Sequence, residues 1–354
     1  MNQIKKRIIH LDFIRIIAIY LVLFNHTGTS GFMLFTVRQG SFFYSFYLFN
    51  AILIKVAVPL FFMVSGALLL GKEESYAQLV KRFFKFSIVL LFASIVSYLY
   101  RHFRLENVDF TIKEFIALIY VQPVAVALWY LYAYLAYILM LPFLRCLAQH
   151  LDQKGFQWLF LMYGLYSLIP LFEFITFRGK YDHYSAFKFF ICTNYLIYPM
   201  LGYYIEHKLK SSVFSKKRLL ILVSSSIISI CVCAALTHWK CTLTGNWDEG
   251  SVQDFFNSLI FIPAGTIYYG IKIFFAKYQP HERTCKLITA LGSATFGLYL
   301  IENICREETV FIFSTLDQHI PTILACWIWI FFACAVGIII TMLLKKFKFI
   351  SKYI

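Results

Sequence analysis

Two ionisable side chains, Arg15 and His26, lie in the first apolar stretch of the chain, IIHLDFIRIIAIYLVLFNHTG. An eleven-residue step turns an α-helix by three turns plus about 20°, so both side chains share one face, roughly 16 Å apart along the axis. A charge buried in a membrane costs roughly 2.5–3.5 kcal/mol, so such a residue usually serves a ligand or a reaction. The stretch therefore predicts a fixed cation and a proton-accepting imidazole at two depths of one helix face.

Three more ionisable residues lie within apolar sequence. Lys55 is inside the run NAILIKVAVPLFFMVSGALLL, and Glu302 is late in the run ATFGLYLIENICRE. Asp12 precedes Arg15 by three residues, a spacing that allows an ion pair on one helix face. Because ionisable groups inside membrane helices usually mark a pathway or a site, we take Lys55 and Glu302, together with the first pair, as candidate catalytic residues.

Each of these residues also has a structural interpretation. Arg15 can extend to the cytoplasmic headgroups, and His26 can be a polar residue at a helix end. Lys55 can pair with a carboxylate, and Glu302 can pair with Arg306 at the i,i+4 spacing. We favour a site because several such groups occur together in otherwise apolar sequence.

The depths of the candidates predict where they meet. The first and ninth apolar spans run in the same direction, with His26 roughly 27 Å and Glu302 roughly 24 Å along their helix axes. Arg15 lies only about 10 Å from the cytoplasmic end by the same rise. We therefore expect His26 and Glu302 to meet near the external end of the bundle, with Arg15 near the cytoplasmic end.

The composition identifies the class of protein. The 354 residues are 60% hydrophobic and 14% charged, with a mean hydropathy of +0.70. A soluble domain is closer to half apolar and a quarter charged. The formal net charge is +15, but the basic residues form short clusters between apolar spans, as the positive-inside rule describes. We therefore expect a polytopic membrane protein that contacts anionic membrane lipids and has no nucleic-acid partner.

Ten apolar stretches are long enough to cross a bilayer as helices. They cover residues 8–29, 45–70, 82–103, 125–147, 156–175, 187–207, 217–237, 252–276, 286–305 and 321–344. An even number of spans puts both termini on one side, and the loops there carry more than twice as many Lys and Arg as the opposite loops. Both termini are therefore predicted to be cytoplasmic. The expected fold is an all-α bundle of about ten transmembrane helices, one integral membrane domain over 1–354 without a soluble domain.

The sequence contains few motifs that indicate other kinds of structure or other chemistries. The apolar segment Phe110–Tyr120 is too short to span and predicts a re-entrant or interfacial piece. The sequence has no G-x-S-x-G, H-E-x-x-H, Walker loop or G-x-G-x-x-G motif. The nine cysteines are scattered, without a C-x-x-C pair or a zinc-spaced His, so we expect free thiols and no metal site.

Several segments together resemble the acyltransferase-3 membrane proteins, which acylate sugars of bacterial surface polysaccharides and related glycans. LDFIRIIAIYLVLFNH resembles the family's opening helix, with Arg, ten residues and then His. VPLFFMVSGALLL resembles the second helix, with Ser65-Gly66 at a turn, followed by a basic segment at 81–85. Trp129-Tyr130-Leu131 resembles the start of a helix that ends at Pro142, and TFGLYLI at 295–301 resembles a late family motif.

The resemblance implies a donor, an acceptor and a location. The donor would be acyl-CoA, most often acetyl-CoA, entering from the cytoplasm, and the acceptor a hydroxyl of a sugar or lipid-linked glycan. The location would be the bacterial cytoplasmic (inner) membrane. Charge-assisted hydrogen bonds from Arg15, Arg82 and Lys85 would hold the CoA phosphates.

The same resemblance, combined with the chemistry of the side chains, gives each candidate a role. His26 would act as general base on the acceptor hydroxyl or would carry the acyl group itself. Glu302 would orient His26, as a carboxylate does in a catalytic triad. Lys55 would stabilise the developing oxyanion.

Two positions depart from the family pattern. Many members carry His where Glu302 stands. Many also carry a second Arg where this chain has Lys85, whose point charge does not grip a phosphate as a planar guanidinium does.

Two functions other than acyl transfer stay open. The first is a transporter or flippase for a lipid-linked sugar, which broken helices or repeat symmetry would favour. The second is a non-catalytic membrane sensor or uptake module. Hydrolysis or exchange of acyl-CoA separates the enzyme from both.

Overall fold

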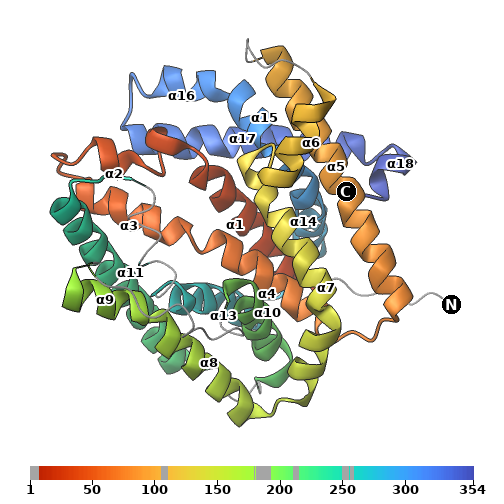
Figure 1. Ribbon diagram of the computed structural model, residues 1–354, viewed down its shortest axis with the longest axis horizontal. Coiled ribbons are helices and arrows are strands. Elements are labelled where there is room, and N and C mark those ends of the chain that lie inside the picture. Colours follow the sequence, from red (N-terminus) through yellow and green to blue (C-terminus); the bar gives the residue numbers. More distant parts are fainter. Residues whose placement is uncertain are drawn as a thin grey trace. The chain divides into compact units, whose positions relative to one another are not determined.

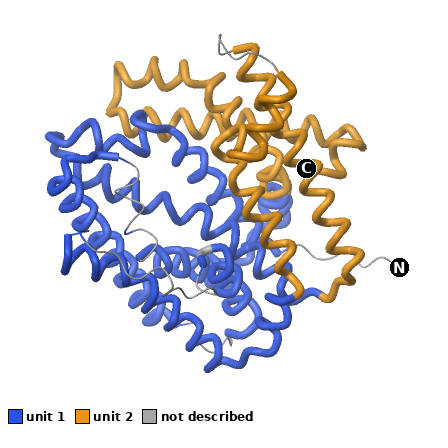
Figure 2. The backbone as a smooth tube through the Cα atoms, in the orientation of Figure 1, with its two compact units in different colours: residues 1–72, 143–289 blue, residues 73–142, 290–354 orange. Residues whose placement is uncertain are grey.

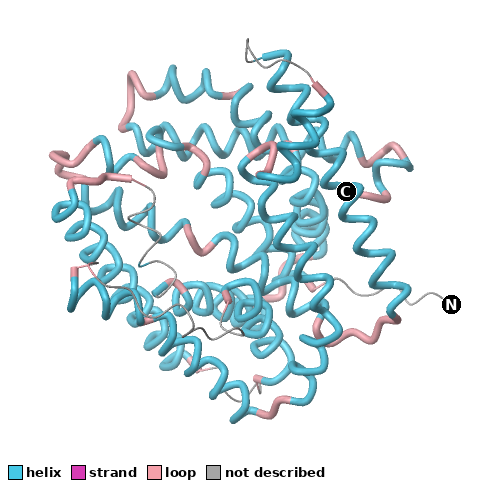
Figure 3. Tube along the Cα trace, viewed as in Figure 1, coloured by secondary structure: helices cyan, strands magenta, loops and turns pink. Residues whose placement is uncertain are grey.

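The computed structural model describes residues 8–104, 111–178, 180, 193–209, 215–248, 255 and 259–354. Regular secondary structure in these residues is entirely helical, which confirms the predicted all-α class (Figure 1 and Figure 3). Helices satisfy their own backbone hydrogen bonds, so they are the natural form for apolar segments that have no water to bond to.

Two compact units make up the chain, and their segments alternate along the sequence (Figure 2). Unit 1 consists of Met1–Lys72 and Phe143–Thr289, and unit 2 consists of Glu73–Pro142 and Ala290–Ile354. Two helices pass from one unit to the other, α7 (Trp129–His150) at Pro142 and α14 (Glu282–Leu300) at Thr289.

Unit 1 is centred on α4 (Ala57–Leu69), which packs against α1 (Ile9–Asn25), α10 (Asn194–Tyr203) and α13 (Phe261–Lys277). The other elements of this unit are η1 (Gly28–Ser30), α2 (Leu34–Val37), α3 (Tyr44–Ile54), α8 (Gln153–Ser167), α9 (Ile169–Phe177), the π-helical turn η3 (Tyr204–Lys208) and α11 (Lys216–Thr244).

Glycines allow the close crossing of α4 and α10. A Cβ atom at Gly66 would overlap the backbone carbonyl of Pro199, and one at Gly202 would overlap that of Met63. Small residues at such crossings let two helix backbones approach closely inside a membrane. The prediction that Ser65-Gly66 forms a turn is therefore wrong, because both residues lie inside α4 and Gly66 serves helix packing.

Unit 2 contains the long helices α5 (Tyr76–Arg104) and α17 (Thr322–Leu344). Its shorter elements are α6 (Ile112–Val121), η2 (Val126–Leu128), α15 (Glu302–Glu308), α16 (Val310–Leu316) and α18 (Lys348–Ser351). The prediction that a helix ends at Pro142 is also wrong, since α7 continues through this residue to His150. A proline inside a helix lacks one backbone hydrogen bond, and the boundary between the units falls at this position.

The short apolar segment of unit 2 forms α6, with its N-terminus capped by Thr111, whose hydroxyl accepts the Glu114 N–H. None of the side chains of α6 is buried within the chain, and Ile112 and Tyr120 are 70% and 91% exposed. A short helix with exposed apolar side chains is consistent with an interfacial position. Phe110, with which the predicted segment begins, lies outside the described residues.

Six helical stretches in the described residues are long and apolar enough to cross a membrane. They are Tyr44–Leu69, Tyr76–Arg104, Val126–His150, Gln153–Phe177, Lys216–Thr244 and Thr322–Leu344, and the bent pair α14–α15 would make a seventh. The predicted spans 8–29, 187–207 and 252–276 correspond to α1, α10 and α13, which are shorter, at 17, 10 and 17 residues. Ten spans and cytoplasmic termini stay predictions.

Gly66→Ala tests the close crossing of α4 and α10. The added methyl group meets backbone atoms, which cannot rotate away, so we expect a loss of about 1–3 kcal/mol of stability, as for overpacked cores. Thermal unfolding of the detergent-solubilised protein measures this loss. The matched control is Gly164→Ala in α8, where a Cβ would meet open space and the change should leave the unfolding temperature unchanged or raise it. Equal unfolding temperatures for both variants would contradict the crossing.

Candidate active site

Arg15 is paired as predicted. Its Nη1 donates to Asp12 Oδ1 at 3.0 Å, one helical step earlier on α1. The Asp12 side chain is 3% exposed, whereas that of Arg15 is 27% exposed. The buried carboxylate thus compensates the cation, while part of the Arg15 side chain stays exposed.

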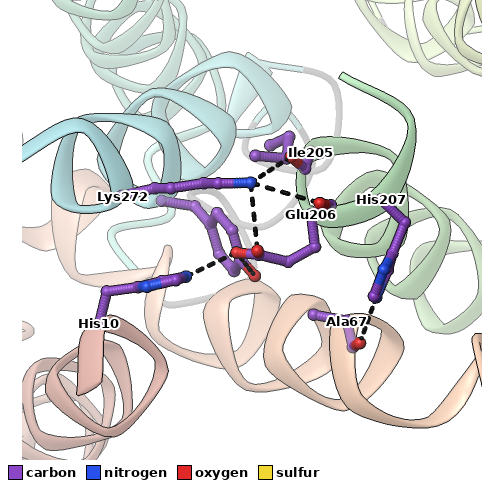
Figure 4. Close-up of polar contacts among 7 residues, drawn as sticks. His10, Ala67, Ile205, Glu206, His207 and Lys272 are labelled. Atoms are coloured by element: carbon purple, nitrogen blue, oxygen red, sulfur yellow. Dashed lines mark hydrogen bonds and ion pairs between the residues drawn. The ribbon is translucent and has the colours of Figure 1, made fainter. Parts of the chain in front are cut away.

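A second polar cluster, absent from the sequence-based candidates, ties the start of α1 to two other helices of unit 1 (Figure 4). Glu206 Oε1 lies 2.6 Å from His10 Nε2 and accepts from the Tyr268 hydroxyl at 3.1 Å. Glu206 Oε2 lies 3.1 Å from Lys272 Nζ, which also donates to the Ile205 carbonyl at 2.7 Å. One carboxylate therefore joins α1, η3 and α13.

The Glu206 cluster holds the N-terminal part of α1, the helix that also carries Arg15. His207, the residue after Glu206, makes a 2.8 Å hydrogen bond with the Ala67 carbonyl and so joins η3 to α4 (Figure 4). The side chains of His10, Glu206 and Lys272 are only 10–15% exposed. The cluster thus fixes the part of α1 that carries Arg15.

The sequence contained a signal for this cluster. His10, Glu206 and Lys272 each lie inside a predicted apolar span, which is the criterion that selected Lys55 and Glu302. They were missed because each lies near a span end, where a charge is ordinary. Only the fold brings the three together.

His26 is the C-cap of α1. Its backbone N–H bonds to the Leu23 carbonyl at 3.2 Å, and its side chain is half-buried. An imidazole that keeps part of its surface exposed can act as a general base.

The loop after His26 reaches Lys55. The Thr27 hydroxyl donates to the Phe24 carbonyl at 2.7 Å and accepts the backbone N–H of Phe32 at 2.9 Å. The Phe32 ring, which is 1% exposed, lies 4.3 Å from Lys55 Nζ in a cation–π contact. The fold thus places the Lys55 cation against the loop that follows the imidazole.

Lys55 stands at a break between two helices. It is the C-cap of α3, and α4 begins at Ala57. Lys55 and Val56 keep right-handed helical backbone angles, so they interrupt the 26-residue helical stretch Tyr44–Leu69 without unwinding it. The interruption places the Lys55 cation between two helical segments of unit 1.

Glu302 stands at a second break, in unit 2. The chain bends by 84° between α14 and α15, with Ile301 between them. This bend falls within the predicted span 286–305, so the depth calculated for Glu302 along one helix axis does not apply beyond Leu300. Glu302 is 2% exposed, begins α15 and lies 3.7 Å from Arg306 Nε at the i,i+4 spacing. A carboxylate at a helix N-terminus is favoured by the helix dipole.

The predicted pairing of Glu302 with His26 stays a prediction, because the two residues belong to different units. The pairing with Arg306 that the sequence also allowed is present. Glu302 therefore has a structural partner within unit 2 whether or not it orients the imidazole.

The basic segment of α5 also belongs to unit 2. Arg82 forms an ion pair with Glu74, a residue that was not among the sequence-based candidates. Lys85 lies one turn further along α5. The predicted phosphate-binding cations are thus arranged as one group on unit 2 and as Arg15 on unit 1.

Two family-like motifs pack against each other in unit 2. Tyr130 stacks on Tyr134 at a centroid separation of 6.0 Å and contacts Tyr299 at 5.8 Å. Phe86 contacts Tyr134 at 4.8 Å and Phe296 at 5.6 Å. The buried Tyr299 hydroxyl donates to the Ala127 carbonyl at 2.6 Å. These aromatic residues therefore serve to pack α5, α7 and α14 together.

Glu206→Gln tests the role of the Glu206 cluster. The change leaves Lys272 largely buried without its carboxylate, so we expect a loss of about 3 kcal/mol, the low end for breaking a buried ion pair. Thermal unfolding in detergent, followed by intrinsic fluorescence, measures this loss. The matched control is Glu282→Gln, which removes an exposed pair with Lys286 and should leave the unfolding temperature unchanged. An unchanged unfolding temperature for both variants would show that the cluster does not stabilise unit 1.

The comparison with known families agrees with the resemblance of the motifs. Residues 8–346 match the family model described as an acyltransferase domain, that of acyltransferase family 3. No curated protein and no solved structure matches the chain. The matched region includes both units and every candidate residue from Arg15 to Glu302. The chain therefore belongs to the acyltransferase-3 family.

Proposed function

We propose that the protein is a membrane O-acyltransferase that moves an acyl group from acyl-CoA to a hydroxyl of a sugar. The family and the apolar helices identify an integral, multi-pass membrane protein with an acyltransferase domain. The proposal adds acetyl-CoA as the donor, a surface polysaccharide or lipid-linked glycan as the acceptor, and the bacterial cytoplasmic membrane as the location.

The observation that carries this proposal is the contact between Lys55 and the loop after His26. A proton acceptor at the end of α1 and a cation against the adjoining loop are what acyl transfer requires. An alcohol needs a base to become a nucleophile. The tetrahedral intermediate needs a nearby positive group or hydrogen-bond donors for its oxyanion.

The chemical step follows from these positions. His26 takes the proton of the acceptor hydroxyl while the hydroxyl oxygen attacks the thioester carbonyl carbon. Lys55 stabilises the negative charge on the carbonyl oxygen. The C–S bond then breaks, the ester forms, and the CoA thiolate leaves with the proton that His26 carried. In the alternative sequence His26 attacks first and holds the acyl group as an acyl-imidazole before the hydroxyl displaces it.

Arg15, Arg82 and Lys85 would bind the donor. The partly exposed guanidinium of Arg15, held by Asp12, supports a charge-assisted hydrogen bond to a phosphate. On unit 2, Glu74 balances the charge of Arg82, and Lys85 follows one turn later on α5. Glu302 remains the candidate for orienting His26.

A transport function is the second candidate, because the helical segment that leads to Glu302 bends by 84° at Ile301. Transporters of several folds bind substrate at such discontinuous helices. Turnover of acyl-CoA by the purified protein distinguishes the two functions, since neither a transporter nor a sensor releases CoA.

His26→Ala tests the proposed enzyme. In acetyl-CoA turnover with free CoA as readout, and with cell-envelope glycan extract as acceptor, we expect kcat to fall about 10²–10⁴-fold, the usual contribution of a general base. The matched control is His319→Ala, which changes an exposed histidine of unit 2 and should leave kcat unchanged. Full activity of His26→Ala would exclude the proposed base. Absence of CoA release by the wild type with acetyl-, succinyl- and longer acyl-CoA would favour transport or sensing.

A further inference from the structure

Three ring side chains from separate segments of unit 1 meet at one place. The Tyr44 hydroxyl lies 2.8 Å from His238 Nδ1, and their rings are 5.3 Å apart in an edge contact. Trp247 contacts both rings edge to face, at 6.1 Å from Tyr44 and 5.9 Å from His238. Each of the three rings thus touches the other two.

The packing of α3 against α11 and the turn that follows α11 bring these rings together. Tyr44 is the first residue of α3, which packs against α11, and His238 lies in the last two turns of α11. Gly245 ends α11 in the left-handed conformation, with φ of 72°, and its N–H bonds to the Cys241 carbonyl at 2.9 Å. Glycine tolerates this conformation, which turns the chain back and returns Trp247 to the end of the helix.

The trio is a surface feature with fixed geometry. His238 is exposed, and Tyr44 and Trp247 are half-buried, so the rings are not part of the core. The hydrogen bond between Tyr44 and His238 restrains both rings. Tyr and Trp offer an apolar face and a polar group on the same rigid side chain. A pyranose ring is complementary, because its C–H face is apolar and its hydroxyl groups form hydrogen bonds.

The trio lies at the end of unit 1 that contains the proposed base. His26 ends α1, the following η1 contacts α2, and α2 contacts α3, which begins at Tyr44. The connection from α1 to α3 therefore folds back at one end, and α1 and α3 pack together. An acceptor held at this end approaches the imidazole from the loops and not through the helix core.

We propose that Tyr44, His238 and Trp247 form a platform that binds the pyranose ring of the acceptor. The nature of the ligand rests on the proposed acyl transfer to a sugar. The platform positions the acceptor, and His238 and Tyr44 provide hydrogen bonds to its hydroxyl groups. A ring of aromatic residues that only faced lipid headgroups would have no preference for a sugar.

Binding of methyl glycosides tests this platform. The probes are methyl β-glucoside and methyl β-N-acetylglucosaminide, and saturation-transfer NMR with the protein in nanodiscs reports which sugar protons touch it. We expect Trp247→Ala to bind about tenfold more weakly, the size expected for loss of one aromatic contact at the centre of a site. Trp247→Phe keeps a ring and should bind within a few-fold of the wild type.

Phe42→Ala is the matched control, because Phe42 is 94% exposed and lies two residues before Tyr44, in the loop that precedes α3. It should leave glycoside binding unchanged. An equal loss for Phe42→Ala and Trp247→Ala would show a general interfacial effect and overturn the platform. Absence of glycoside binding by the wild type, or undiminished binding by Trp247→Ala, would overturn it as well.

Release of CoA from acetyl-CoA without acceptor, measured on the same samples, separates this inference from the proposed function. Glycoside binding that depends on Trp247 without any CoA release would support the platform while the enzyme proposal fails. CoA release without glycoside binding would support the enzyme proposal and overturn the platform.

Discussion

A charged side chain among apolar helices costs several kcal/mol unless a partner or a polar environment compensates it, and this constraint organises the structure. Glu206 is compensated by His10, Tyr268 and Lys272, and through them joins three helices of unit 1. Lys55 stands between α3 and α4, and Glu302 begins a new helix after a bend of 84°. The charges thus determine where helices are tied together and where they are interrupted.

The breaks explain how an otherwise apolar chain offers polar groups for chemistry. At Lys55, the interruption lets a cation contact Phe32 in the loop after His26. At Ile301, the 84° bend makes Glu302 the first residue of a new helix, where its carboxylate is favoured. In a straight helix, each of these two residues would contact only side chains of neighbouring helices. Side chains in these spans are mostly apolar.

The sequence was sufficient for the class of fold and for local pairings. Apolar runs of spanning length predicted helices, and the three-residue spacing predicted the ion pair of Asp12 with Arg15, because both depend on residues close in the chain. The sequence was insufficient where distant segments meet. Gly66 was assigned to a turn from the family resemblance, and its contact with Pro199 was not predicted because Pro199 is far away in the sequence. Pro142 was assigned to a helix end, although α7 tolerates it internally.

The candidate site, too, could be predicted from the sequence only where it depends on residues close in the chain. Arg15, His26 and Lys55 were recognisable as ionisable groups in apolar sequence, but the contact that links the loop after His26 to Lys55 runs through Thr27 and Phe32, which carry no such signal. The Glu206 cluster required three segments to fold together. The bend at Ile301 was not predicted, because neither a proline nor a glycine stands at the break.

The central claim is that His26 and Lys55 act on the same reaction, and a double-mutant cycle on kcat tests it most directly. The cycle compares His26→Ala, Lys55→Met and the double variant in acetyl-CoA turnover. If the base and the oxyanion-stabilising cation act as a unit, the double variant loses little more than the worse single variant, as groups of one catalytic centre do. Losses that multiply would show independent effects and contradict a shared centre in unit 1.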